Sequence, residues 1–156
     1  MHSMADTTAE NLDLDERELT AWRGFLIAHR QIIAQLDDEL EREHGLPLVS
    51  YEVLLLLAEE PDDHALRMGE LADRLLLSRS GLTRLVDRLA ARGFVERHSC
   101  PADRRGTYAR LTEEGMAKFR EARPTLLRGV RRHFLDHVPD KDLDRMGAIW
   151  GRISPA

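Results

Sequence analysis

The sequence of 156 residues contains a single cysteine, Cys100. One cysteine excludes an internal disulfide framework and any zinc or iron–sulfur site held by four thiolates of one chain. A reducing compartment, the cytoplasm, is therefore expected. No apolar run approaches the roughly 18 residues of a membrane span, and the first residues lack the basic and apolar regions of a signal peptide. The sequence therefore predicts no membrane partner.

Catalytic and cofactor motifs are also missing. The sequence has no Gly-x-Ser-x-Gly, no phosphate-cradling glycine loop, no dinucleotide fingerprint and no His-Glu-x-x-His. The densest acid–base cluster, residues 62–64, follows Pro61 in what reads as a solvated surface turn. His133 and His137 have the spacing of two metal ligands on one helix face, but that spacing is common by chance. We therefore expect no enzyme, no cofactor and no metal site.

The charge is distributed unevenly along the chain. The net charge is −5, but residues 1–66 hold 4 basic against 16 acidic side chains, residues 67–110 hold 10 against 5, and residues 111–156 hold 9 against 7. All ten cations of the middle segment are arginine. The planar guanidinium group suits phosphate and guanine edges better than a lysine does. The middle third is therefore a candidate for binding nucleic acid.

Hydrophobic spacing predicts a mainly α-helical chain with one folded domain at residues 12–156, after a polar, disordered tail at residues 1–11. A helix at about 13–44 carries apolar residues every 3.5 positions, from Leu19 to Leu40. A second helix, capped by Ser50, is apolar nearly all round, so we expect it in the core and ending at Pro61.

The C-terminal part predicts two further helices. Thr112 is a candidate cap for a helix at about 113–136, in which Pro124 predicts a kink or a break. The last helix repeats the seam pattern with Leu143, Met146, Trp150 and Ile153. A small central domain cannot cover the apolar seams of the first and last helices. We therefore expect the segments at about 12–44 and 113–154 to form a homodimer.

Between these segments lies a helix–turn–helix pattern followed by a hairpin. One short helix has its apolar face at Met68, Leu71 and Leu75, and the next, from Ser78 as its cap to Arg92-Gly93, turns Leu82, Leu85, Val86 and Leu89 inward. Residues 94–97 and 107–111 read as two paired strands around a polar loop. The sequence therefore predicts a small β-hairpin beside a helix pair, with a DNA-binding part at about 50–111.

The outward face of the second short helix is rich in hydrogen-bonding groups, namely Arg79, Ser80, Thr83, Arg84, Asp87 and Arg88. Such a face fits the major groove of B-DNA, and the N-terminus of the helix favours a phosphate. The alternative is a solvated face held by pairs of Asp87 with Arg84 or Arg88. Gly81, inside this helix, either allows close approach to DNA or meets a local packing need. Leu76 stands where many such turns have glycine.

Several short motifs of this region together resemble the MarR (multiple-antibiotic-resistance regulator) family. They are Leu82-Thr83-Arg84-Leu85-Val86-Asp87-Arg88-Leu89, Arg92-Gly93-Phe94-Val95-Glu96-Arg97, Asp103-Arg104-Arg105-Gly106 and Leu111-Thr112-Glu113-Glu114-Gly115. The resemblance covers about residues 20–153 and is strongest over 67–115. It implies a winged helix-turn-helix domain flanked by N- and C-terminal dimerisation helices, and a bacterial, cytoplasmic, homodimeric regulator of transcription. The partner implied is double-stranded DNA with a pseudo-palindromic operator.

The resemblance also implies roles for particular residues. Ser78, Arg79, Ser80, Thr83, Arg84 and Arg88 would contact DNA from the recognition helix, and Asp103, Arg104 and Arg105 would do so from the wing, where the aspartate steadies the arginine in the minor groove. The protein would be a repressor modulated by a small effector, with small aromatic acids as the first candidates.

Two sets of residues, and the function itself, leave alternatives open. Trp22 and His29 are candidates for binding the effector, although a histidine in an apolar seam is also common as a hydrogen-bonded interface residue. Cys100 lies in the expected wing loop, where it is either a modifiable thiol or a bystander. The alternative function is a winged-helix protein-interaction module that does not bind DNA.

Overall fold

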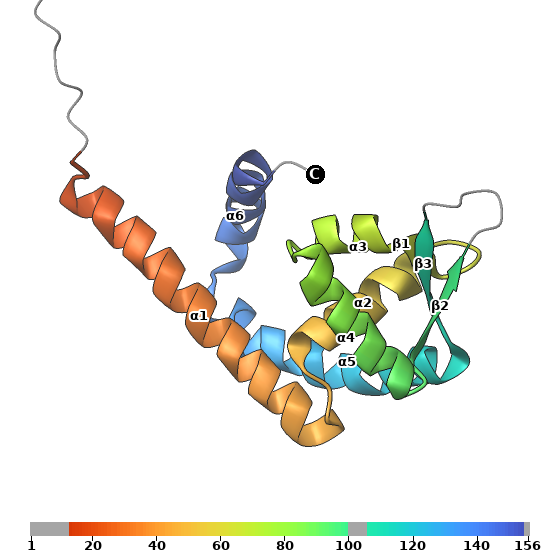
Figure 1. Ribbon diagram of the computed structural model, residues 1–156. Helices are drawn as coiled ribbons and strands as arrows, with labels where there is room; N and C mark the ends of the chain where they lie inside the picture. Colours follow the sequence, from red (N-terminus) through yellow and green to blue (C-terminus); the bar gives the residue numbers. More distant parts are fainter. Residues whose placement is uncertain (1–12, 100–105, 155–156) are drawn as a thin grey trace, which may run out of the picture. The chain divides into compact units, whose positions relative to one another are not determined.

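A computed structural model describes residues 13–99 and 106–154 of the chain. The elements, in order, are α1 (Glu16–His44), α2 (Leu48–Glu59), β1 (Ala65–Arg67), α3 (Met68–Arg74), α4 (Arg79–Ala91), β2 (Val95–Ser99), β3 (Thr107–Leu111), α5 (Glu113–His133), a 3₁₀ turn η1 (Leu135–His137) and α6 (Asp140–Ile153) (Figure 1). The mainly helical class with a small antiparallel sheet is as predicted. Two compact units divide the chain after Gln31, within α1.

In the first unit, the described residues form the N-terminal part of α1. The Asp15 carboxylate accepts hydrogen bonds from the backbone N–H groups of Arg17 and Glu18, and the Glu18 carboxylate accepts one from the N–H of Asp15. This reciprocal cap satisfies donors that the first turn leaves free. Farther along, Trp22 and Phe25 are about half exposed. The predicted apolar seam therefore begins on a helix surface that this unit does not bury.

In the second unit, α2 begins three residues earlier than the sequence predicted. It starts at Leu48 after Pro47, and Ser50 is a buried residue of the helix rather than its cap. The backbone N–H of Leu48 donates instead to Asp37 Oδ1 on α1, at 2.8 Å. This cap comes from eleven residues away, so a search for a neighbouring capping side chain misses it. The prediction that α2 lies in the core is confirmed, since Val53, Leu54 and Leu57 are fully buried.

The helix–turn–helix is formed by α3 and α4, as predicted. The Ser78 hydroxyl caps α4 by accepting a hydrogen bond from the backbone N–H of Gly81 at 3.0 Å. Gly93, just past the end of α4, has the positive φ of 79° expected of a C′ glycine. In the turn, Leu76 itself adopts a φ of 53° with its side chain almost fully exposed. A leucine thus holds a left-handed conformation that usually favours glycine.

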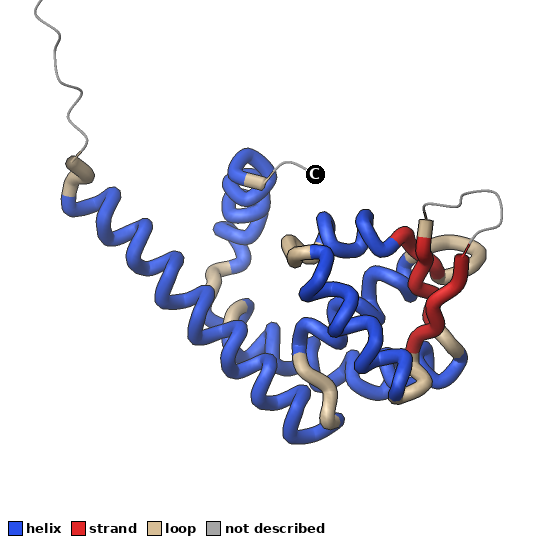
Figure 2. The backbone as a smooth tube through the Cα atoms, viewed as in Figure 1, coloured by secondary structure: helices blue, strands red, loops and turns tan. Residues whose placement is uncertain are grey.

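The sheet has three strands rather than the predicted two. Its order is β1-β3-β2, with both pairings antiparallel, and β2 pairs with β3 as predicted (Figure 2). The additional strand, β1, has only three residues, too few for an alternating pattern to reveal. Its Arg67 lies beside Tyr108 of β3, which in turn lies beside His98 of β2. The Arg67 guanidinium lies over the Tyr108 ring, which is stacked with the His98 ring.

The helix that follows the sheet, α5, is continuous from Glu113 to His133, so of the kink or break predicted at Pro124 the break does not occur. Proline removes one backbone hydrogen bond, but Pro124 lies on the exposed face, where water can reach the carbonyl that loses its partner. The helix begins as predicted, because the Thr112 hydroxyl accepts from the N–H of Gly115 at 3.0 Å. It ends three residues before the predicted end, and η1 follows it.

Candidate nucleic-acid interface

The two faces of α4 differ as the sequence predicted. Leu82, Leu85, Val86 and Leu89 are buried in the core. Of the residues predicted to contact DNA, Thr83 is partly buried and the others on this helix, Ser78, Arg79, Ser80, Arg84 and Arg88, are exposed. The structure therefore leaves all six at least partly accessible, on α4 or at its N-cap.

The small polar residues at the start of α4 also make hydrogen bonds within the first turns of the helix. The Ser78 hydroxyl accepts from Gly81 and lies 3.3 Å from the Ser80 hydroxyl, and Thr83 Oγ1 donates to the carbonyl oxygen of Arg79 at 2.9 Å. A Cβ atom at Gly81 would lie 3.0 Å from Ser78 Oγ, inside the cap. Of the two explanations for this glycine, the structure supports the local packing need.

Asp87 makes a contact that the sequence did not predict. Instead of pairing with Arg84 or Arg88 on its own helix, its Oδ1 accepts a hydrogen bond from Arg97 Nη1 of β2 at 2.8 Å. Both side chains are partly exposed, at 55% and 38%. The pair therefore joins the outward face of α4 to the first strand of the predicted wing. Only the packing of β2 beside α4 brings these two residues together, and no local spacing signals it.

An arginine-lined cavity of about 310 Å³ lies between the start of α3, the start of α4 and the sheet. Arg67, Arg79 and Arg97 contribute to its lining, together with Thr83 and Thr107. Arg67 and Arg97 were missed as candidate site residues, although both belong to the arginine-rich segment. Guanidinium groups can donate hydrogen bonds to phosphate oxygens. The charge of the cavity is mixed, however, because Glu70 also lines it and Arg97 is paired with Asp87. The cavity thus extends the surface of α4 onto the sheet.

The predicted wing contacts cannot be placed in the same way. β2 and β3 form the two sides of the hairpin, but Asp103, Arg104 and Arg105 lie outside the described residues, as does Cys100.

The two candidate effector residues lie in the first unit. The Phe25 ring is 6.0 Å from Trp22 and 6.1 Å from His29 between centroids, so the three form a ladder along α1. Trp22 and His29 are both exposed in this unit.

The candidate metal ligands are not arranged as a pair. His133 is the last residue of α5 and lies 2.8 Å from the Glu39 carboxylate, whereas His137 belongs to η1. The helix ends before it can bring both imidazoles to one face. Within residues 13–99 and 106–154, no group of three or more metal-binding side chains is found.

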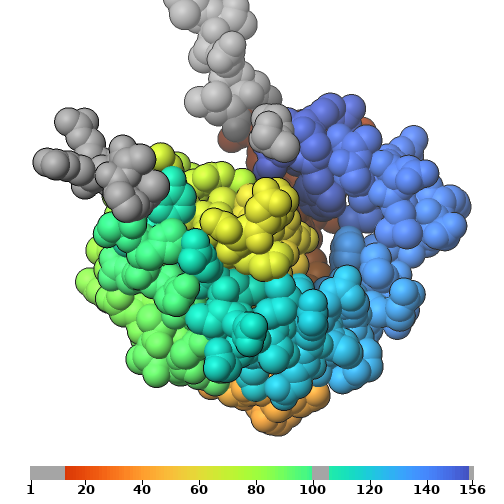
Figure 3. Space-filling view, turned by 90° about the vertical axis from the view of Figure 1, so that its right-hand side faces the viewer, coloured from red at the N-terminus to blue at the C-terminus, as the bar shows by residue number. Residues whose placement is uncertain are grey.

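The acid–base cluster at residues 62–64 has a structural role. Asp63 Oδ2 accepts a hydrogen bond from Arg110 of β3, and the carbonyl oxygen of His64 accepts one from the N–H of Leu111. These bonds hold the connection after α2 against β3, where Figure 3 shows the residues around 60 next to β3 and α5. A cavity of about 340 Å³ lies here, lined in part by His64, Glu113 and Arg120. The cluster is therefore more than the simple solvated turn predicted.

The order of elements, with a helix–turn–helix followed by an antiparallel hairpin and an arginine-rich outward face on the second helix, defines a winged-helix protein of the kind that binds nucleic acid. Comparison with known proteins agrees. Residues 44–106 match the model of the MarR family. The regulator MhqR of Bacillus subtilis is 31% identical over 111 residues, which cover 71% of this chain and 74% of MhqR. The chain belongs to the MarR family of transcriptional regulators.

Two solved structures show the same fold. AbsC, a MarR family regulator from Streptomyces coelicolor, is 33% identical with a TM-score of 0.84 over 90% of this chain and 94% of AbsC. Sco3205 from the same organism, solved in complex with DNA, is 35% identical with a TM-score of 0.85 over 90% and 88% of the two chains. The predicted family, the winged-helix fold and the assignment as a regulator rather than an enzyme are confirmed.

In the described part of the chain, no helix is long and apolar enough to cross a membrane.

Proposed function

We propose that the protein is a homodimeric regulator that binds a pseudo-palindromic operator in double-stranded DNA and acts as a repressor. The observation that carries this proposal is the exposed face of α4, which carries Arg79, Arg84 and Arg88. Arg79 also lines the cavity shared with α3 and the sheet. A recognition helix in the major groove places such side chains against base edges and phosphates. The solved complex of the similar protein Sco3205 with DNA supports it.

Individual roles follow from position on α4. Arg79 and Ser80 lie in the first turn, next to the free N–H groups of the helix, and would bind backbone phosphate. Arg84 and Arg88 lie farther along the exposed face, and Arg84 would contact a base edge. Thr83 is partly buried and its hydroxyl hydrogen is already donated to Arg79, so it would accept a hydrogen bond or contact a thymine methyl group.

The test is duplex binding by the full chain. Saturable binding should weaken steeply with salt, by about 10³–10⁵-fold between 50 and 200 mM if 6–10 phosphates are neutralised. Arg84→Ala should cost about 1–3 kcal/mol per half-site and relax the preference at one operator position. Arg120→Ala is the matched control, because Arg120 is an exposed arginine on α5 that lines a different cavity.

Each outcome of this test is informative. Uniform weakening by Arg84→Ala across all sequences would reassign Arg84 to a phosphate. A wild-type protein without salt-sensitive DNA binding would favour the alternative, a winged-helix module for protein partners.

Dimerisation would use the apolar residues that the terminal helices expose. Trp22 is 53% exposed in its unit, and on α6 Trp150 and Ile153 are 40% and 67% exposed. Each large apolar side chain buried in a dimer contributes about 1.5–3 kcal/mol. Removing residues 141–156 should therefore give aggregated or unfolded protein, measured by size-exclusion chromatography and circular dichroism. A soluble, well-folded monomer would contradict the proposal.

A small aromatic acid is the effector proposed, with Trp22 and His29 as its contacts. The aromatic ladder with Phe25 offers ring faces, and an imidazolium can pair with a carboxylate. A ligand regulates only if it distinguishes the arrangement that binds DNA from the one that does not. A compound that raises thermal stability but leaves operator affinity unchanged would refute a regulatory role.

A further inference from the structure

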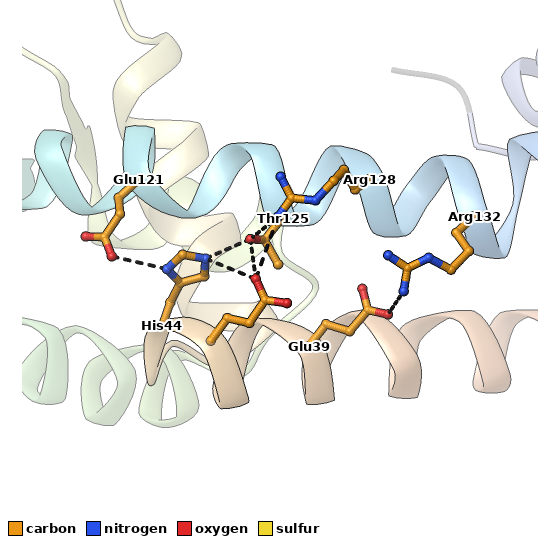
Figure 4. Close-up of polar contacts among 7 residues, drawn as sticks. Glu39, His44, Glu121, Thr125, Arg128 and Arg132 are labelled. Carbon is orange, nitrogen blue, oxygen red and sulfur yellow. Dashed lines mark hydrogen bonds and ion pairs between the residues drawn. The ribbon is translucent and has the colours of Figure 1, made fainter.

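The C-terminal end of α1 is joined to α5 by a cluster of polar side chains, all within the second unit, in which His44 and Thr125 are buried and the charged side chains around them are partly exposed (Figure 4). At its centre is His44, whose side chain is only 10% exposed. Its Nε2 atom lies 2.8 Å from Thr125 Oγ1, and its Nδ1 atom lies 3.3 Å from Glu121 Oε1. Both ring nitrogens of one histidine therefore face oxygen atoms of the same helix.

Thr125 determines which nitrogen of His44 carries a proton. The Thr125 residue is buried, and its hydroxyl has only one hydrogen. That hydrogen is donated to Glu43 Oε2 at 2.8 Å, while Arg128 Nη2 donates to Thr125 Oγ1 at 3.0 Å. In this arrangement Thr125 has no hydrogen left for His44, so Nε2 must be the donor.

A neutral imidazole cannot complete the cluster. With its one hydrogen on Nε2, it presents the lone pair of Nδ1 to the Glu121 carboxylate, and the two repel. If the hydrogen moves to Nδ1, His44 donates to Glu121, but Nε2 then needs the Thr125 hydrogen and Glu43 loses it. Only the imidazolium, with hydrogens on both nitrogens, satisfies Thr125, Glu43 and Glu121 together.

We propose that His44 is a proton-sensitive latch, which holds the end of α1 on α5 more firmly as its imidazole takes up a second proton. Histidine is the side chain that ordinarily changes charge between pH 5 and 8.

The charged groups around His44 are nearly balanced. On α1, Glu43 Oε2 lies 4.0 Å from Nε2, and Arg42 is occupied by Asp38. On α5, Glu121 is also 3.6 Å from Lys118 Nζ, and Arg128 is 3.7 Å from Glu43. These two lysine and arginine contacts weaken the attraction of the carboxylates for an imidazolium without removing it, because neither replaces the missing hydrogen at Nδ1. At the end of α4, Arg92 donates to the carbonyl oxygen of Gly45.

The contact from Arg92 relates the latch to DNA binding, and this step rests on the proposed function. Arg92 is the C-cap residue of the proposed recognition helix, and its Nη1 lies 2.7 Å from the carbonyl oxygen of Gly45, the residue after His44. His44 therefore holds the end of α1 on α5, and the C-terminal end of α4 is hydrogen-bonded to the next residue, Gly45. We expect operator affinity to vary with the protonation of His44 through this contact.

The decisive variant is Glu121→Gln. Its amide can donate to Nδ1 of a neutral His44, so the cluster is complete without the second proton. Glu121 is 59% exposed, so the substitution is compatible with folding. His44→Gln removes the titrating group. His137→Gln is the matched control, because it makes the same change at an exposed histidine.

Thermal unfolding of the full chain between pH 8 and pH 6 tests the latch. Relative to the wild type and the control, Glu121→Gln should have an equal or higher melting temperature at pH 8 and a lower one at pH 6. A tenfold change in the folded-to-unfolded ratio corresponds to about 3–5 °C. His44→Gln should lose the same part of the pH response. Parallel profiles for the wild type, Glu121→Gln and the control would overturn the proposal.

Operator binding at the same two pH values gives the second measurement. The ratio of wild-type affinities at pH 6 and pH 8 should differ from the ratio for Glu121→Gln. If the two affinity ratios are equal but the unfolding profiles are as expected, His44 stabilises the contact between α1 and α5 without affecting DNA binding. If no variant binds duplex DNA at any pH, the proposed function fails, and the unfolding profiles still decide the latch.

Discussion

Gly115, in the first turn of α5, is the position where a single methyl group should have the largest effect. A Cβ atom there would overlap the carbonyl oxygen of Phe94 and lie 2.7 Å from Leu111 Cδ1. The leucine side chain has some freedom to move, but the carbonyl belongs to the connection between α4 and β2, and it also accepts a hydrogen bond from the N–H of Thr112. Gly115→Ala must therefore displace backbone.

The expected loss is about 1–3 kcal/mol in the free energy of unfolding, the usual cost of inserting a methyl group into a well-packed position. The higher helix propensity of alanine, at most about 1 kcal/mol, offsets only part of the overlap. Gly24→Ala on α1 is the matched control, since a Cβ atom there meets nothing within 4 Å and the position lies off the apolar seam of that helix. The control should be stabilised by about 0.5–1 kcal/mol.

Urea denaturation followed by circular dichroism would measure both variants. By thermal melting they should differ by about 3–16 °C, with Gly115→Ala the lower. Because Thr112 and Phe94 connect α5 to the end of α4, the proposed recognition helix, Gly115→Ala should also weaken operator binding. Equal stability of the two variants would refute the close approach of α5 to Phe94.

Three further predictions concern charged residues. In a double-mutant cycle, Asp87→Ala and Arg97→Ala should couple by about 0.2–1 kcal/mol in unfolding, as partly exposed pairs do, and additive effects would contradict the ion pair. The hydrogen bond from His133 lowers the pKa of Glu39, so the folded state loses stability as pH falls below about 4. In Glu39→Gln, the free energy of unfolding should therefore fall less at acid pH than in the wild type. An unchanged loss at acid pH would argue against the pair. In the wing, Asp103→Ala should weaken operator binding although it removes a negative charge. Non-additive effects of Asp103→Ala and Arg105→Ala would support a coupled pair, and tighter binding by Asp103→Ala would refute it.

The helices and the hairpin could be predicted because their signals are local. Ser78 and Thr112 cap the helices that follow them, and Gly93 ends α4 with a positive φ, as the residue types indicated. The division of α4 into a buried and an exposed face followed from spacing alone. Each of these features depends on residues within about four positions of one another.

The remaining features depend on contacts between distant segments. Asp37 of α1 caps α2, so α2 begins earlier than its own sequence predicted. The pairing of Asp87 with Arg97 needs β2 beside α4, and β1 is recognisable only by its pairing with β3. The cluster around His44 joins residues about 80 positions apart. Such contacts are set by tertiary packing, so a single sequence gives no periodic signal for them.

The hydrogen bond from Arg92 to the carbonyl oxygen of Gly45 holds the proposed recognition helix, α4, at its C-terminal end, which is the end farther from Arg79. The helix has 13 residues and is therefore about 20 Å long. A rotation of about 5° about the fastened end would displace Arg79 by about 1.7 Å, a large part of a hydrogen-bond length. A small rotation of α4 near Arg92 therefore becomes a larger displacement at Arg79, where the protein would contact DNA. Substitutions near Gly45 should therefore alter operator choice without touching a base.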